Sequence, residues 1–193
     1  MYSGAAIILA SLGETVVSGH AVALNIASIV FMLPLAIGLA ASTRVGNLLG
    51  EKRYIDARYS SKISLSLCFI GALLNMTLLI TLGDKLISLY TKDLLVYSVA
   101  SHLIIFAAIF QIPDGIGMGS LGALRGYKDT FMTMVFIVIA YWVFAIPFGY
   151  YLTYYGINQP MGESGMWISM ILGLTIFASL ISRRLIKISG QYL

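Results

Sequence analysis

Long runs of apolar residues, separated by short polar segments, follow one another along the whole chain. A helix needs about 20 mainly apolar residues to cross the hydrocarbon core of a bilayer. Five runs reach or approach this length: residues 19–41, 63–82, 94–124, 131–155 and 165–181. The opening run, residues 1–12, is too short to span. The pattern therefore predicts an all-α integral membrane protein, a transmembrane bundle of five full spans and one partial N-terminal span.

The two ends of the chain differ in character. The opening run is expected to be the second half of a helix, which suggests a fragment of a longer protein or a start at an internal methionine. The last segment contains Arg183, Arg184 and Lys187. We expect residues 1–182 to form the bundle, with its first helix truncated, and residues 183–193 to form a basic cytoplasmic tail.

The polar segments and prolines predict how the spans begin, end and bend. Residues 44–62 carry mixed charges and are predicted to form a helical piece at the membrane interface. Residues 83–93 are predicted to form a polar turn, whose Asp93 caps the next helix. Pro34 lies in the middle of the second segment, and Pro147 is expected to break the fifth. Prolines within several spans suit a transporter that bends.

Lys and Arg are distributed unevenly between the two sides that alternating loops define. Residues 13–18, 83–93 and 156–163 carry two of them, whereas residues 44–62, residues 125–128 and the tail carry ten. Cytoplasmic loops are rich in Lys and Arg, so the second side, with the C-terminus, should be cytoplasmic in a plasma (inner) membrane. An aromatic belt is expected at the opposite interface, formed by Tyr150, Tyr151, Tyr154, Tyr155 and Trp167.

The composition supports a membrane protein and excludes several other classes. The chain is 59% hydrophobic and 10% charged, whereas about a quarter of the residues in soluble domains are charged. The net charge of +4 is small and lies in loops, so membrane lipids are expected partners and nucleic acid is not. The lone cysteine, Cys68, excludes a disulfide framework. No catalytic triad, phosphate loop or pair of carboxylates gives support for an enzyme, and no cofactor is expected.

Asp114 is the one acidic residue predicted to lie deep in a span. A carboxylate there is costly, so it indicates a functional site, and its desolvation favours exchange of a proton or cation. Pro113 loosens the helix beside it. Gln111 lies nearly one turn back, and Phe110 lies at i−4, where its ring can face a cation. The structural alternatives are a hydrogen bond from Asp114 to a neighbouring helix and a core or lipid-facing role for Phe110.

Two further polar residues are candidates for the site. His20, near a membrane edge, is a candidate proton relay, with a hydrogen-bonded interface residue as the alternative. Asn25 is expected to join helices or to line the cavity. No metal-ligand spacing is present, so no metal site is predicted beyond Na⁺ at Asp114. Residues 117–122 match GxGxxG, but inside an apolar run this pattern predicts close helix packing and not a dinucleotide site.

Five stretches, in the same order along the chain, resemble motifs of one transporter family. They are GHAVALN at 19–25, FMLPL at 31–35, TRVGNLLG at 43–50, QIPD at 111–114 and LRGYKDT at 124–130. Through them the sequence resembles the MATE (multidrug and toxin extrusion) family, in its NorM-like branch. The resemblance implies two six-helix lobes around a central cavity, of which this chain corresponds to the C-terminal lobe, so that an N-terminal lobe is an implied partner.

The resemblance also implies a function and roles for particular residues. Family members exchange inward Na⁺ or H⁺ for outward cationic, amphipathic drugs. Asp114 corresponds to the acid of this lobe's cation site and Phe110 to an aromatic residue near it. A second acid of that site would precede Met1. Ala21 replaces a frequent Gln, and Pro113 replaces a frequent Ser.

Three hypotheses therefore remain open on the sequence alone. The first is a cation-coupled multidrug efflux antiporter, with Na⁺ or H⁺ as the coupling ion. The second is a membrane fragment or assembly module that does not transport. The third is a lipid-linked-sugar flippase of the related superfamily, which usually lines its cavity with several basic residues, and here none is predicted in mid-span.

Overall fold

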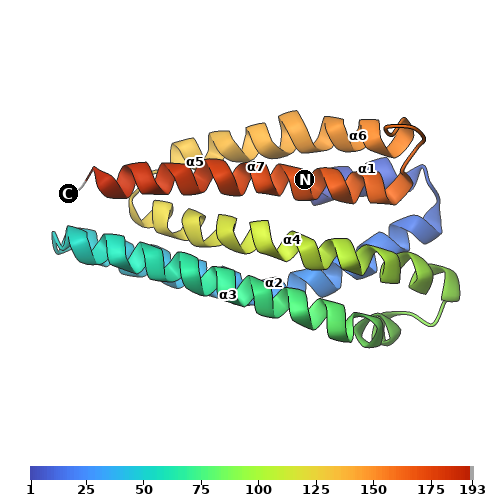
Figure 1. The fold of residues 1–193 in the computed structure, drawn as a ribbon, viewed down its shortest axis with the longest axis horizontal. Helices are drawn as coiled ribbons and strands as arrows, with labels where there is room; N and C mark the ends of the chain where they lie inside the picture. Colours follow the sequence, from blue (N-terminus) through green and yellow to red (C-terminus); the bar gives the residue numbers. More distant parts are fainter. Residues whose placement is uncertain (192–193) are drawn as a thin grey trace.

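The computed structural model describes residues 1–191, and these fold into helices joined by short turns (Figure 1). The elements are α1 (Tyr2–Ala10), α2 (Glu14–Gly50), α3 (Tyr54–Tyr90), α4 (Leu94–Gly126), α5 (Thr130–Ile137), the π-helix η1 (Val138–Ala145), α6 (Ile146–Tyr154) and α7 (Gly162–Gly190). Within this part of the chain, five helices are long and apolar enough to cross a membrane, with α5, η1 and α6 forming one of them. The predicted all-helical membrane bundle, with one short N-terminal helix, is confirmed.

Helix α4 lies in the middle of the bundle. It packs against α2 and α3 on one side and against α7 on the other, and the span from α5 to α6 covers α7 (Figure 1). The short α1 contacts α2, α6 and α7. The turn between α2 and α3, the start of α5 and the end of α7 lie at one end of the bundle, where Arg184 Nε lies 2.6 Å from Asp129 Oδ2. The predicted alternation of loops between two ends therefore holds.

Glycines let α4 come close to its neighbours. A Cβ atom on Gly122 would collide with the carbonyl group of Gly38 in α2. A Cβ atom on Gly115 would lie 2.9 Å from the carbonyl oxygen of Cys68 in α3. The GxGxxG pattern thus serves helix packing, as predicted, because only a residue without a side chain allows two backbones to approach this closely.

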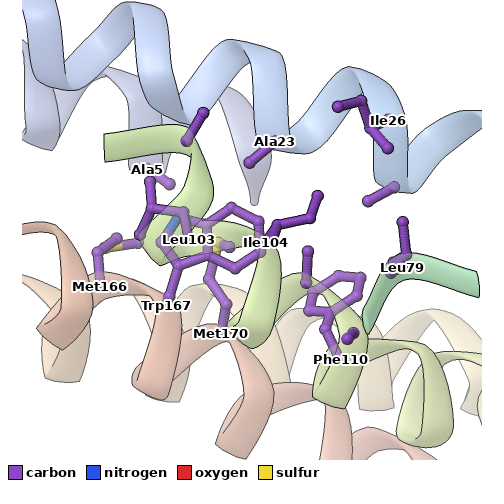
Figure 2. Close-up of a cluster of buried hydrophobic side chains, with 14 of the residues drawn as sticks. Ala5, Ala23, Ile26, Leu79, Leu103, Ile104, Phe110, Met166, Trp167 and Met170 are labelled. Carbon is purple, nitrogen blue, oxygen red and sulfur yellow. The ribbon is translucent and has the colours of Figure 1, made fainter. Parts of the chain in front are cut away.

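A cluster of buried side chains fills the half of the bundle that contains α1 and the start of α7. Figure 2 shows Trp167 and Met170 of α7 reaching toward Leu103 and Phe110 of α4, below α2. Trp167 is fully buried. The prediction that Trp167 belongs to an aromatic belt was therefore wrong, because its ring packs inside the hydrophobic core. Among the belt tyrosines, the rings of Tyr150 and Tyr154 pack with their centroids 4.7 Å apart.

The helices extend beyond the apolar runs that predicted them. Residues 44–62, expected as one interfacial piece, are the end of α2 and the start of α3, with only residues 51–53 between them. Residues 83–90, expected as a turn, continue α3. Hydropathy marks where a helix leaves the apolar layer, whereas backbone hydrogen bonds can continue further into a polar environment. Asp93 does cap α4, accepting from the Leu95 amide at 2.8 Å, as predicted.

The last two spans also differ from the prediction. The chain is not broken at Pro147, because the wider π-helix Val138–Ala145 comes directly before it and carries the helical path through. The Ser169 hydroxyl of α7 donates to the Ala145 carbonyl at 2.6 Å across this junction. Helix α7 continues to Gly190, so most of the predicted tail is its last turns, while Tyr192 and Leu193 lie outside the described residues.

The contact between α4 and α2 can be tested with Gly122→Ala. We expect this substitution to lower the free energy of unfolding by about 1–3 kcal/mol, because the added methyl group forces two backbones apart. Thermal unfolding in detergent, followed by circular dichroism, measures the loss. Gly50→Ala is the control, because nothing lies within 4 Å of its Cβ position. Equal stability of the Gly122 variant and the unmodified chain would contradict the close packing.

Candidate functional site

Asp114 faces a small cavity between three helices. The cavity measures about 80 Å³ and is lined by Tyr2 of α1, by Leu24, Ala27, Ser28 and Phe31 of α2, and by Phe110 and Asp114 of α4. The Asp114 side chain is partly buried, and none of residues 1–191 forms a hydrogen bond or ion pair with it. The alternative role predicted for this acid, a hydrogen bond to a neighbouring helix, is therefore not found among these residues.

Aromatic rings form one wall of the cavity. Phe110, one turn before Asp114, is 3% exposed. Its ring centroid lies 6.1 Å from that of Tyr2 and 6.2 Å from that of Trp167. Because Phe110 and Asp114 are on one face of α4, the cavity combines an aromatic face with a negative charge. That combination favours cations, which a carboxylate attracts by charge and a ring by its quadrupole.

The oxygen atoms around the cavity define what it can hold. Ser28 donates its hydroxyl proton to the Leu24 carbonyl at 2.7 Å, which leaves lone pairs on Ser28 Oγ free to accept. Tyr2 supplies a phenolic oxygen and Asp114 two carboxylate oxygens. No group of three or more His, Cys, Asp or Glu side chains suited to a metal occurs in the described chain. One carboxylate with a few neutral oxygens suits a proton, a monovalent ion or an organic cation.

A polar network behind the cavity connects three helices. Pro34 has no amide hydrogen, so the Val30 carbonyl in α2 loses its helical donor. Asn75 Nδ2 of α3 replaces that donor at 2.7 Å. Asn75 Nδ2 also lies 3.4 Å from Gln111 Oε1 of α4, and Gln111 Nε2 donates to the Ala27 carbonyl at 3.4 Å.

The network changes the place of Gln111 in the site. Gln111 is 1% exposed and does not line the cavity, although it was a candidate for the site around Asp114. It instead holds the backbone of α2 at Ala27, which does line the cavity. Gln111 and Asn75 thus support the shape of the cavity from behind.

His20 and Asn25 lie in a neighbouring hollow of about 290 Å³, which shares Tyr2, Leu24 and Ser28 with the cavity. His20 is 1% exposed, and its Nδ1 accepts a hydrogen bond from Trp167 Nε1 at 3.1 Å. This bond leaves the proton on Nε2, which has no partner among the described residues. Asn25 is exposed and donates to the Ala21 carbonyl of its own helix at 2.8 Å.

Three residues of the site region were not predicted as part of it. Asn75 carried a sequence signal, because it is an amide in the middle of an uncharged apolar run. Tyr2 belongs to the short opening run, and nothing in its local pattern distinguishes it. Trp167 was assigned to the surface, whereas it contacts both His20 and Phe110. Only the packing of distant segments brings these side chains together.

The fold and the cavity define a polytopic helical membrane protein with one unpaired acid between its spans. The profile of the family described as MatE matches residues 5–151. The chain is 41% identical over 186 residues to the multidrug resistance protein NorM of Vibrio vulnificus (strain YJ016), covering 96% of this chain and 41% of that protein. It is 34% identical over 194 residues to the multidrug resistance protein PmpM of Pseudomonas aeruginosa, covering 100% of this chain and 41% of that protein.

The chain belongs to the MatE family, and the resemblance to its NorM-like members is confirmed. The crystal structure of the eukaryotic MATE transporter AtDTX14 has the same fold, with a TM-score of 0.80 at 23% identity, covering 92% of this chain and 40% of that one. An outward-facing multidrug resistance MATE family transporter matches with a TM-score of 0.76 at 15% identity, covering 98% and 44%. The chain spans about two fifths of the length of these relatives.

The network of Asn75 can be tested with a double-mutant cycle. Asn75→Leu leaves the Val30 carbonyl unpaired, and we expect it to cost about 1–3 kcal/mol of stability. Pro34→Ala returns a helical donor to that carbonyl, so Asn75→Leu should cost about 1 kcal/mol less in that background. Unfolding in mixed micelles measures each variant, with Asn25→Leu as the control for an exposed asparagine. Strictly additive costs would contradict the proposed link.

Proposed function

We propose that the chain is the C-terminal lobe of a cation-coupled multidrug efflux antiporter, which exports cationic, amphipathic compounds. Relatives at 34–41% identity are named multidrug resistance proteins. The observation that carries the proposal is Asp114, a carboxylate without a partner among the described residues, in a cavity with aromatic walls. In the relatives, the part that this chain does not match would correspond to the other lobe of such a transporter.

The coupling follows from the charge of Asp114. A carboxylate away from bulk water is unfavourable until a proton, a Na⁺ ion or an organic cation neutralises it. Only one of these can satisfy it at a time, so an inward-moving ion displaces an outward-moving drug. Transport then requires that the inward-facing and outward-facing states differ in their affinity for the two ligands.

The neighbouring residues have supporting roles in this proposal. The Phe110 ring lies against a bound cation, and Gln111 positions the cavity wall through the Ala27 carbonyl. His20 relays protons through Nε2, which faces no hydrogen-bond partner in residues 1–191. Asn25 offers a polar contact to substrate in the neighbouring hollow.

The proposed location is the plasma (inner) membrane, with the C-terminus in the cytoplasm. Ten of the twelve Lys and Arg residues lie at the end of the bundle that carries the end of α7. Cytoplasmic ends of membrane proteins have this excess. A lipid-linked-sugar flippase has less support, because the cavity at Asp114 is lined by no Lys or Arg. A non-transporting fragment remains the alternative, and drug-dependent proton flux by this chain alone would contradict it.

Removing the charge at Asp114 tests the coupling. We expect Asp114→Asn in the full-length protein to reduce export of a cationic dye such as ethidium to the level of cells without the transporter. The amide has the same size but cannot exchange a proton or attract a cation. Efflux of dye from loaded cells is the measurement. Glu14→Gln, which removes an exposed acid at the start of α2, should export normally. Unchanged efflux by the Asp114 variant would refute the proposal.

The aromatic wall can be tested by ligand binding. We expect Phe110→Leu to weaken binding of tetraphenylphosphonium by about 2- to 30-fold, since a ring facing a cation contributes about 0.5–2 kcal/mol. Phe110→Tyr should bind nearly normally. Isothermal titration of the purified full-length protein gives the affinities. Phe106→Leu is the control, because Phe106 lies one turn away and does not line the cavity. Equal losses in both leucine variants would show a general packing effect.

A further inference from the structure

A third hollow, separate from the Asp114 cavity and from the hollow at His20, lies between α2 and α3 toward the end where these helices are joined. It is a groove of about 440 Å³. Four residues of α2 line it, Ile37, Ala40, Ala41 and Arg44, together with four residues of α3, Ser60, Ile63, Ser64 and Leu67. The groove is therefore polar toward the turn between the helices and apolar toward the middle of the spans.

A buried hydroxyl in the groove lacks a partner. Ser64 is 5% exposed, and its Oγ has no hydrogen-bond partner within the described chain. The Cys68 thiol, one turn further along α3, lies 3.7 Å from the Pro34 carbonyl, to which it donates. Ser61, by contrast, donates to the Ala57 carbonyl of its own helix at 2.8 Å. Ser64 Oγ is enclosed by the protein, so a ligand in the groove would instead meet the Ser60 hydroxyl, which forms none of the hydrogen bonds of the described chain.

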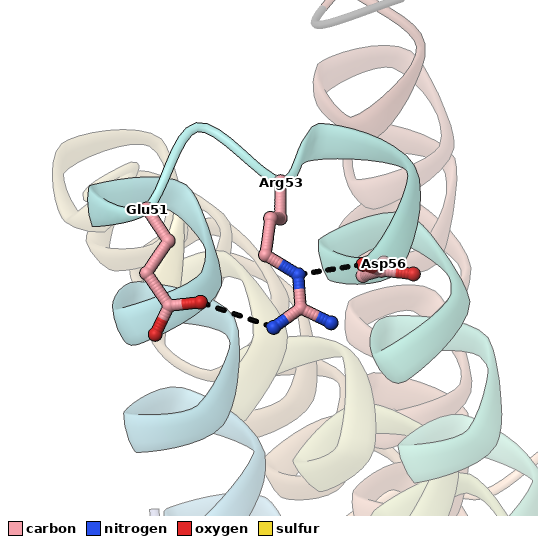
Figure 3. Close-up of polar contacts among 3 residues, drawn as sticks. All are labelled: Glu51, Arg53 and Asp56. Carbon is pink, nitrogen blue, oxygen red and sulfur yellow. Dashed lines mark hydrogen bonds and ion pairs between the residues drawn. The ribbon is translucent and has the colours of Figure 1, made fainter.

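The positive charge of Arg44 is also uncompensated. Arg44 is exposed at the mouth of the groove, and none of the ion pairs in the described chain includes it. The two acids closest to the turn between α2 and α3 in sequence are paired with Arg53, which lies 3.1 Å from Glu51 and 2.8 Å from Asp56 (Figure 3). A free guanidinium beside buried serine hydroxyls is a suitable site for a phosphate group, which accepts several hydrogen bonds at once.

We propose that this groove binds one anionic phospholipid. Its phosphate group lies against Arg44 and Ser60, and an acyl chain follows Ile37, Ile63 and Leu67 toward the middle of the bilayer. Both parts of the groove are needed for this ligand, because a soluble phosphate would leave the apolar part unfilled. Anionic lipids concentrate in the cytoplasmic leaflet, to which the Lys and Arg distribution assigns this end. The bound lipid holds α2 and α3 together between Pro34 and the turn that joins the two helices. Its binding does not depend on the proposed antiport.

The test measures lipid binding to the full chain purified in a mild detergent. Dioleoylphosphatidylglycerol is titrated, and bound lipids are counted by native mass spectrometry. We expect one saturable adduct that forms at least about tenfold more tightly than with dioleoylphosphatidylcholine, because the charge on the lipid distinguishes the two. Arg44→Gln should weaken it about tenfold, and Ser60→Ala several-fold. Ala40→Phe, which fills part of the groove from an exposed position, should abolish it.

Two matched variants control for general charge and polarity. Arg53→Gln removes a neighbouring charge that is already paired, and Ser61→Ala removes a hydroxyl that is bonded to its own helix, so both should bind the lipid normally. Circular dichroism shows whether each variant is folded. If Arg44→Gln does not fold, Ala40→Phe still tests whether the lipid occupies the groove.

Several outcomes would overturn the proposal. Equal binding of the two lipids would show that the site is not selective for negative charge. Binding of glycerol 3-phosphate as tight as that of the lipid would identify a soluble phosphate as the ligand. A loss in Arg53→Gln as large as that in Arg44→Gln would show diffuse attraction to the basic end, and the absence of a saturable adduct would show no site.

Discussion

Inside a bilayer, each backbone carbonyl that loses its helical donor must find another one, and this constraint organises the centre of the protein. Pro34 frees the Val30 carbonyl, and Asn75 from the next helix satisfies it. Asn75 in turn lies beside Gln111, which reaches back to α2 at Ala27. These hydrogen bonds link α2, α3 and α4, in addition to the close packing of the three helices.

This satisfied network makes the unsatisfied carboxylate beside it more informative. Asp114 lies one turn from Gln111, yet it faces the cavity and bonds to none of the described residues. This contrast between a satisfied network and a free carboxylate is the basis for proposing Asp114 as a ligand-binding residue. The glycines of α4 contribute by a different route, because Gly122 lets α4 approach α2 closely at Gly38 and Gly115 lets it approach α3 at Cys68.

The groove between α2 and α3, nearer the turn that joins these helices, also contains polar groups that the described chain leaves unpaired. Arg44 and Ser60 line the groove and form no ion pair or hydrogen bond within the described chain, while Ser61 donates to its own helix and Arg53 is paired with Asp56. The cavity and the groove share α2, and Pro34 lies between Ala27 on the cavity side and Arg44 on the groove side. A ligand bound in either proposed site would therefore contact a helix whose backbone hydrogen bonding is interrupted in its middle.

The sequence by itself determined the membrane bundle, the number of spans, the alternation of loops between two ends and Asp114 as the central acid. These properties depend on the local content of apolar and charged residues, because the hydrocarbon core of a bilayer favours long apolar helices and disfavours charges. Only the tertiary structure decided that Gln111 supports the cavity from behind, that Trp167 is a core residue bonded to His20, and that Asn75 and Tyr2 belong to the site. The reason is physical: Asn75 meets Val30 across 45 positions and Trp167 meets His20 across 147, and no local pattern encodes such contacts. The helix ends were likewise settled by backbone hydrogen bonds that continue beyond the apolar layer.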